Sequence, residues 1–177
     1  MTNASATGEH SSARAGWDEF APLYDEHHAR LYRIALLLSH GSTAVAEDAV
    51  AETFVRVYPI WADGKVDNFF PYARRALVNQ IMGVYRGESV ATRHAAVQSG
   101  DLRGERTLED GVVDAASTFE LLGQLPPRQR TAVVLRYYED LSYDQIAATM
   151  NVSVGTAKAQ VSVGLQRLRE LMKRDGP

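Results

Sequence analysis

Four polar side chains able to form hydrogen bonds lie close together near the end of the sequence: Thr156, Lys158, Gln160 and Ser162. Hydroxyl groups suit DNA phosphates, and lysine and glutamine side chains can read base edges in the major groove. The chemistry that this set indicates is binding to DNA through hydrogen bonds and charge.

The residues around this set predict a helix-turn-helix. Ser142 and Gln145 form a capping box that starts a short helix at Tyr143, and Asn151 can adopt the left-handed conformation that ends it. Ser153 can cap a second helix. In a helix-turn-helix the second helix enters the major groove by its N-terminal turns. Its predicted buried stripe, at steps of three and four, comprises Val154, Ala157, Val161, Leu165, Leu168 and Met172.

The other side of this second helix is the predicted duplex-binding surface. Gly155 allows its first turn to approach the DNA backbone, and the helix N-terminus attracts a phosphate. An ordinary helix pair with a solvated basic face is the alternative. The predicted contacts are Ser153, Thr156, Lys158, Gln160, Ser162, Val163 and Arg167.

The elements that must position this pair are also helical. Apolar residues recur at helical steps over 17–39, 43–61, 69–86, 112–125 and 127–138, and no stretch alternates like a strand. Residues 89–113 are polar and aperiodic, which is typical of a flexible linker, and residues 1–16 are predicted to be a disordered tail. The sequence therefore predicts an all-α protein with two small helical domains, residues 17–88 and 114–177.

Composition limits the classes of function. The 177 residues include no cysteine, which excludes disulfides and thiolate metal sites. The longest apolar run, Ile34–Leu38, is far shorter than the roughly 20 residues of a membrane span, so we expect a cytoplasmic protein without membrane insertion. His27 and His28 lack a partner at the i+4 spacing, and no glycine-rich phosphate loop occurs, so we expect no enzyme, metal or cofactor.

Charge is distributed unevenly along the chain. The net charge is −3, yet residues 153–177 carry five basic and two acidic side chains. Residues 1–61 carry eight acidic and four basic ones. This asymmetry permits an acidic docking surface and a separate surface for a polyanion.

Four stretches, in the same order along the chain, resemble the extracytoplasmic-function (ECF) group of bacterial RNA polymerase sigma factors. SYDQIAATMNVSVGTAKAQVSVGLQRLREL is similar to the promoter-reading domain, sigma region 4, and LLGQLPPRQRTAVVLRYYEDL to the helix pair before it. AEDAVAETFVRVYPIW resembles the polymerase-docking helix of sigma region 2, and YARRALVNQIMGVYR is similar to an actinobacterial, SigE-like subgroup. The resemblance implies that residues 17–88 form region 2 and residues 114–177 form region 4.

The resemblance also implies roles for residues of the first domain. The largest subunits of core polymerase would be contacted by Asp48, Ala51, Glu52 and Val55; a solvated acidic helix face is the alternative. The loop 62–68 and the helix after it would hold unstacked bases of the minus-10 element. Those minus-10 candidates are Asn68, Phe70, Tyr72, Arg75, Asn79 and Arg86. For Phe69 and Tyr72 a place in the protein core is the favoured alternative, and Asn68 and Phe70 are the better candidates for touching DNA.

The implied partners are core RNA polymerase, promoter DNA bound at its minus-10 and minus-35 elements, and an anti-sigma protein. Relatives often carry arginine near Gln160 and Val163, so the minus-35 sequence is expected to differ from the common one. Glutamine favours adenine where arginine favours guanine. The alternative function is a polymerase-independent helix-turn-helix regulator, which would bind paired half-sites as a dimer.

Overall fold

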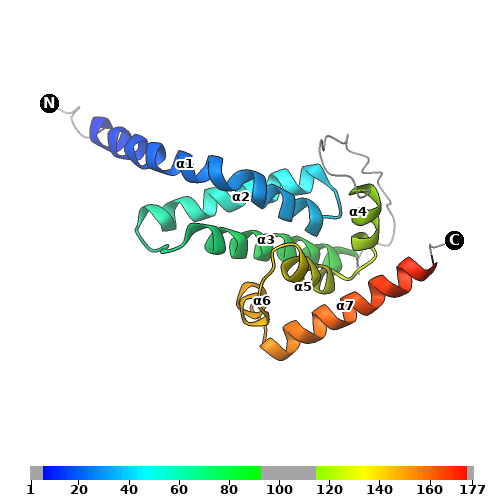
Figure 1. Cartoon of the computed structure of the whole chain (residues 1–177). Helices are drawn as coiled ribbons and strands as arrows, with labels where there is room; N and C mark the ends of the chain where they lie inside the picture. Colours follow the sequence, from blue (N-terminus) through cyan, green and yellow to red (C-terminus); the bar gives the residue numbers. More distant parts are fainter. Residues whose placement is uncertain (1–5, 93–114, 175–177) are drawn as a thin grey trace.

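The computed structural model describes residues 6–92 and 115–174, and within these residues all regular secondary structure is helical, with no strand. The predicted all-α fold is therefore confirmed. Figure 1 shows the arrangement of the helices. They are α1 (Ala6–Leu38), α2 (Thr43–Ala62), α3 (Phe69–Thr92), α4 (Ala115–Gly123), α5 (Pro127–Tyr137), α6 (Tyr143–Met150) and α7 (Val154–Arg174).

Helices α1 to α3 pack together as a first lobe. Its core is built around the fully buried ring of Phe20. Four aromatic rings surround Phe20 at centroid distances of 5.0–6.1 Å: Phe54, Tyr58, Trp61 and Phe69. Edge-to-face ring pairs of this kind add about 0.5–1.5 kcal/mol each beyond the area that they bury. The aromatic cluster therefore joins all three helices.

Helices α4 to α7 form a second lobe, in which α7 packs against α5 and α6. The buried side chains of Leu125, Leu135 and Ile146 lie in its core. A methyl group added at Gly164 of α7 would lie 2.7 Å from Cγ2 of Val133 in α5. Glycine at this position therefore permits the close approach of α7 to α5.

The two lobes pack against each other. Helices α1 and α3 contact α5, α3 also contacts α6, and α1 contacts α4. In Figure 1 the second lobe lies along one side of α3. The ring of Phe119 in α4 lies against Gly41, in the turn between α1 and α2. The sequence predicts two domains joined by a flexible linker, and such domains need not touch. The contacts between the lobes are therefore a feature that the sequence does not indicate.

Two helices are longer than the sequence predicts. Helix α1 begins at Ala6, within the stretch expected to be a disordered tail, and α3 continues to Thr92, into the expected linker. Alanines are frequent in residues 6–15 and favour helix. Gly16 lies against the hydroxyl of Tyr58, which supports α1 from α2. The rest of the predicted linker, residues 93–113, lies outside the described residues.

Candidate nucleic-acid interface

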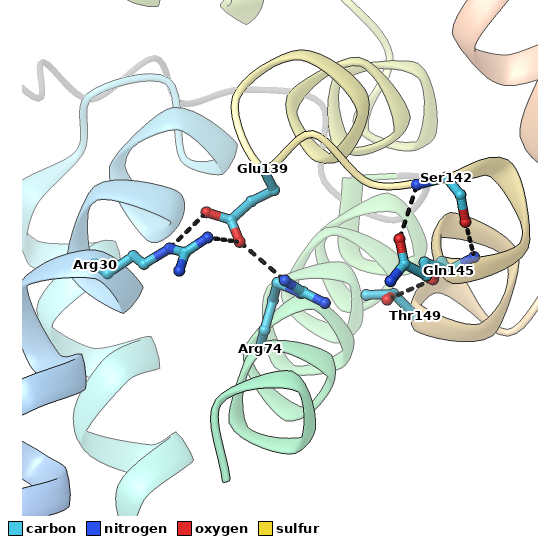
Figure 2. Close-up of polar contacts among 6 residues, drawn as sticks. All are labelled: Arg30, Arg74, Glu139, Ser142, Gln145 and Thr149. Carbon is cyan, nitrogen blue, oxygen red and sulfur yellow. Dashed lines mark hydrogen bonds and ion pairs between the residues drawn. The ribbon is translucent and has the colours of Figure 1, made fainter. Parts of the chain in front are cut away.

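The turn between α6 and α7 has the predicted geometry. The Ser142 hydroxyl accepts a hydrogen bond from the Gln145 amide (3.2 Å), and the Gln145 side-chain oxygen accepts one from the Ser142 amide (2.9 Å), as Figure 2 shows. Asn151 adopts the left-handed conformation, with φ 54° and ψ 52°. Ser153 caps α7 by accepting from the amide of Thr156 (3.1 Å). The capping box, the asparagine turn and the serine cap are all confirmed.

One face of α7 is buried and the other faces solvent. Ala157 and Val161 are buried, as predicted, while Val154, Leu165 and Leu168 are half-buried against the core. Met172 was expected in the same stripe, and this prediction is wrong. Its side chain is 61% exposed, because it lies in the last turn of α7, beyond Leu168, the last residue of this helix that packs against the core.

The predicted duplex-binding residues lie on the outer side of α7 and in the turn before it. Lys158, Ser162, Val163 and Arg167 are exposed, and so is the capping residue Ser153. Thr156 and Gln160 are half-buried, and the Thr156 hydroxyl is hydrogen-bonded to that of Ser153 (2.8 Å). This surface offers hydroxyl, amide, ammonium and guanidinium groups together.

An aromatic ring near the turn helps to arrange the basic groups. The ring of Tyr143, the first residue of α6, has the guanidinium of Arg136 at 5.3 Å and the ammonium of Lys158 at 5.6 Å from its centroid. A cation at this distance from an aromatic ring is attracted by its π-electrons. Sequence analysis missed this contact, because Arg136 and Lys158 come from two different helices, α5 and α7.

The acidic candidates are exposed on α2. Asp48 and Ala51 face solvent, and Val55 is 70% exposed although it is apolar. Glu52 is half-buried and its carboxylate pairs with Arg56 one turn later (2.6 Å). The other side of α2 is buried in the first lobe. The surface therefore combines carboxylates with an exposed apolar side chain.

Most of the minus-10 candidates are also accessible. Asn68, Arg75, Asn79 and Arg86 are exposed, and Tyr72 is exposed as well, which favours a surface role over a place in the core. Phe69, the other residue for which the core was an alternative, is buried.

The loop before α3 also carries a stable positive charge. The hydrogen bond between Lys65 and the Asp63 carboxylate (2.9 Å), together with the charge of that carboxylate, raises the pKa of Lys65. Lys65 therefore stays cationic beside these candidates.

Phe70 is an exception. It was predicted to touch DNA, and only 9% of its surface is exposed in this arrangement of the lobes, so its contact with DNA stays a prediction. The centroid of the Phe70 ring lies 5.3 Å from that of the His27 ring. The guanidinium of Arg30 lies over the Phe70 ring, 4.2 Å from its centroid. The guanidinium of Arg74 is 5.5 Å from the same centroid. His27 and the two arginines therefore pack against the ring.

A carboxylate from the second lobe joins these two arginines. Arg30 donates to Glu139 through Nε and through Nη2, both at 3.1 Å, and Arg74 donates through Nη1 at 3.0 Å. Figure 2 shows Glu139 reaching from the end of α5 to α1 and α3. Glu139 and Arg74 are buried. Because Glu139 is 109 residues from Arg30 and 65 from Arg74, no local pattern indicates the cluster.

A second buried arginine also connects the lobes. Arg130 of α5 donates to the carbonyl oxygens of Leu122 (2.9 Å) and Leu125 (3.0 Å), near the end of α4. It also donates to the carbonyl of Leu38 at the end of α1 (2.6 Å) and to the hydroxyl of Tyr85 in α3 (3.2 Å). Arg130 thereby satisfies carbonyl groups that helix ends leave without partners. A charged residue one turn before the buried Val133 and Val134 is the only sequence signal for it.

Two other kinds of site were sought in the part of the chain that the structure describes. It holds no group of three or more histidine, aspartate or glutamate side chains that could bind a metal ion. None of its helices is both long and apolar enough to cross a membrane.

Comparison with known proteins identifies the family. Residues 23–89 match the family Sigma-70 region 2, and residues 118–168 match Sigma-70, region 4. The chain is 33% identical to the ECF RNA polymerase sigma factor SigE of Mycolicibacterium smegmatis, over 96% of this chain and 66% of that protein. It is 32% identical to the ECF RNA polymerase sigma factor SigL of Mycobacterium tuberculosis, over 87% of this chain and 89% of SigL.

A solved structure has the same fold. The sigma factor RpoE from Bartonella quintana, in complex with the anti-sigma factor NepR, matches with a TM-score of 0.72 and 23% identity, over 89% of this chain and 99% of that one. The matches do not favour a polymerase-independent regulator, because both sigma regions are present in one chain. With region 2 in the first lobe and region 4 in the second, the chain belongs to the ECF RNA polymerase sigma factors, which direct transcription.

Proposed function

We propose that this sigma factor binds core RNA polymerase through the exposed face of α2 and holds two promoter elements through α3 and α7. The observation that carries the proposal is the α6–α7 turn, which presents a continuous polar face on α7 within a chain that has both sigma regions. The protein needs no chemistry of its own for this role. Its site of action is the cytoplasm, where polymerase and DNA are found.

The minus-35 duplex binds to the N-terminal turns of α7. Lys158 and Gln160 read base edges, the hydroxyls of Thr156 and Ser162 contact phosphates, and Arg167 reaches the flanking backbone. The exposed Val163 meets a thymine methyl group. The exposure of Lys158, Ser162, Val163 and Arg167 supports this assignment. The ring of Tyr143 supports it further, because it attracts the ammonium group of Lys158.

The minus-10 element binds to the other lobe. Asn68 and Tyr72 contact unstacked bases, while Arg75, Asn79 and Arg86 contact the strand on which those bases lie. The exposure of all five residues supports this assignment. The two lobes bind one promoter together, so that binding by one raises the effective concentration of the other. On this view residues 17–88 and 114–177 are the two DNA-binding units, and residues 89–113 connect them.

Core polymerase binds to Asp48, Ala51, Glu52 and Val55. Carboxylates beside an exposed valine suit a protein interface with a charged rim and an apolar centre. An anti-sigma protein is a further proposed partner, because the matching Bartonella quintana structure contains one.

The test is run-off transcription with purified core polymerase and a library of promoter fragments. We expect a promoter-dependent product from the wild-type chain and a loss of at least about 10-fold from the double variant D48K/E52K, because like charges replace complementary ones at the interface. The matched control is D25K, which reverses an exposed carboxylate on α1. No product from the wild-type chain, while a known sigma factor is active, would contradict the proposal.

A further inference from the structure

We propose that Arg30, Phe70 and Arg74 form a phosphate-binding site for single-stranded DNA, and that Glu139 of the second lobe occupies this site until the lobes separate. The inference rests on the proposed function and deepens it. It assigns a ligand to two arginines that the proposed minus-10 surface does not include, and it gives the contact between the lobes a role.

The geometry of Glu139 is that of a bound anion. One carboxylate oxygen accepts from Nε of Arg30, and the other accepts from Nη2 of Arg30 and Nη1 of Arg74, all within 3.0–3.1 Å. Arginine binds the two oxygens of a carboxylate and those of a phosphate in the same forked manner. The side chain of Glu139 is only 1% exposed and that of Arg74 only 8%, so this pair is shielded from water, whereas the side chain of Arg30 remains 53% exposed.

Arg74 also has a donor that Glu139 leaves unused. Its Nε is buried and makes no hydrogen bond, which is unfavourable for a charged group. A nucleotide backbone carries several oxygens along its length and can reach donors that a single carboxylate does not. The unused donor therefore indicates that the carboxylate is an incomplete ligand for this pair of arginines.

Phe70 supplies the second feature of a single-strand site. Its ring has guanidinium groups from Arg30 and Arg74 at 4.2 and 5.5 Å from its centroid. Proteins that bind single strands combine positive charge along the backbone with aromatic rings on which bases stack. Phe70 and Arg74 lie one turn apart on α3, the helix that also carries the proposed minus-10 residue Arg75.

The consequence is a closed form in which a strand cannot bind between Arg30 and Arg74, although the proposed minus-10 residues and the polar face of α7 are exposed. A strand can bind between Arg30 and Arg74 only when Glu139 has left, so the measured dissociation constant equals the intrinsic one divided by the fraction of open protein.

The first test measures binding of the full chain to a fluorescent 12-nucleotide single strand of random sequence, by anisotropy, without polymerase. We expect E139Q to bind about 10-fold more tightly than the wild type, because the open form becomes the major one. The control D140N makes the same change of charge at an adjacent carboxylate that is 98% exposed, and should change binding less than about twofold. Adding R74Q to E139Q should abolish the gain.

The second test measures the separation of the lobes. The chain has no cysteine, so dyes can be placed specifically at D25C in α1 and K173C in α7, both exposed positions. We expect energy transfer to fall in E139Q, and to fall in the wild type when the single strand is added. The charge swap R30E/R74E/E139R should keep the lobes together, because one arginine then lies between two carboxylates, and it should not bind the strand because both arginines of the site are gone.

Each outcome decides the inference. Tighter binding and lower energy transfer in E139Q, absent in D140N, support it. Equal binding and energy transfer in E139Q and the wild type would overturn it. If E139Q does not fold, the charge swap decides, and strand binding by the swap at the wild-type level would overturn the inference. If the wild-type chain supports transcription with core polymerase while both tests fail, only the inference is lost and the proposed function stands.

Discussion

The two DNA-facing regions differ in how they are built and in how accessible they are. The polar face of α7 is positioned by contacts close in sequence, namely a capping box, an asparagine turn and a serine cap, and it is open to solvent. The cluster of Arg30, Phe70 and Arg74 joins α1 and α3, and a residue of the other lobe closes it. The binding surface of α7 depends only on residues close in sequence and is accessible in this structure. The surface built from α1 and α3 depends on distant segments, and a residue of the second lobe occupies it.

The largest effect on stability is expected from removing Arg130, whose hydrogen bonds connect the two lobes. R130A removes the hydrogen bonds of a buried guanidinium to carbonyl oxygens at the ends of α1 and α4. We expect the free energy of unfolding to fall by about 3–4 kcal/mol, since each bond to a charged group contributes about 1.5–3 kcal/mol and the bonds are not additive. Urea denaturation followed by circular dichroism measures this change. R128A, an exposed arginine on the same helix, is the control; equal stability of the two variants would contradict the assignment.

Substitutions on the exposed face of α7 should lower transcription without changing how the two lobes pack. K158E places a negative charge on the exposed face of α7, and we expect promoter-dependent transcription to fall about 10- to 100-fold, because loss of a base contact costs about 1–3 kcal/mol. Energy transfer between the lobes should stay at the wild-type value. K173E, in the last turn of α7, is the matched reversal. A similar loss in both variants would indicate a general effect of charge.

Substitutions at two glycines of α7 should have opposite effects on stability, because Gly164 packs against α5 and Gly155 is exposed. In G164A the new methyl group would lie 2.7 Å from Cγ2 of Val133, and we expect destabilisation of about 1–3 kcal/mol. In G155A the space is open, and the gain in helix propensity should stabilise the protein by up to about 1 kcal/mol. Thermal unfolding measures both changes. A stabilising G164A would show that α5 and α7 are less closely packed than described.

The smallest effect is expected at the capping box. S142A removes the acceptor for the Gln145 amide, and we expect a loss of about 1 kcal/mol in the free energy of unfolding. Urea denaturation measures it, with S162A on the exposed face of α7 as the control. If S162A lowers stability as much as S142A does, Ser162 has a structural role and its proposed contact with DNA weakens.

Much of the second lobe could be predicted because its signals are local. Helical periodicity, the Ser142–Gln145 box and the left-handed Asn151 each depend on residues within one or two turns. Those signals identified α6, α7 and the exposed polar set between Ser153 and Arg167. The same reasoning misplaced Met172, because periodicity tells which side of a helix is apolar but not where its packing partner ends.

The first lobe shows where local reasoning stops. Its helices and the buried ring of Phe69 follow the apolar pattern, yet Phe70 was expected to be free and is buried. The residues that pack on its ring include His27 and Arg30 of α1, and neither is close to Phe70 in the sequence. Residues from far apart in the chain meet there only after both lobes have folded.

The sequence by itself determined the helical class, the two sigma regions and the surface of α7, because periodicity and capping act between near neighbours. Only the tertiary structure decided that Glu139 reaches Arg30 and Arg74, and that Arg130 joins the ends of α1 and α4. The physical reason is that a buried charge is tolerated only where opposite charges or hydrogen-bond partners surround it, and those partners are brought together by the packing of distant helices.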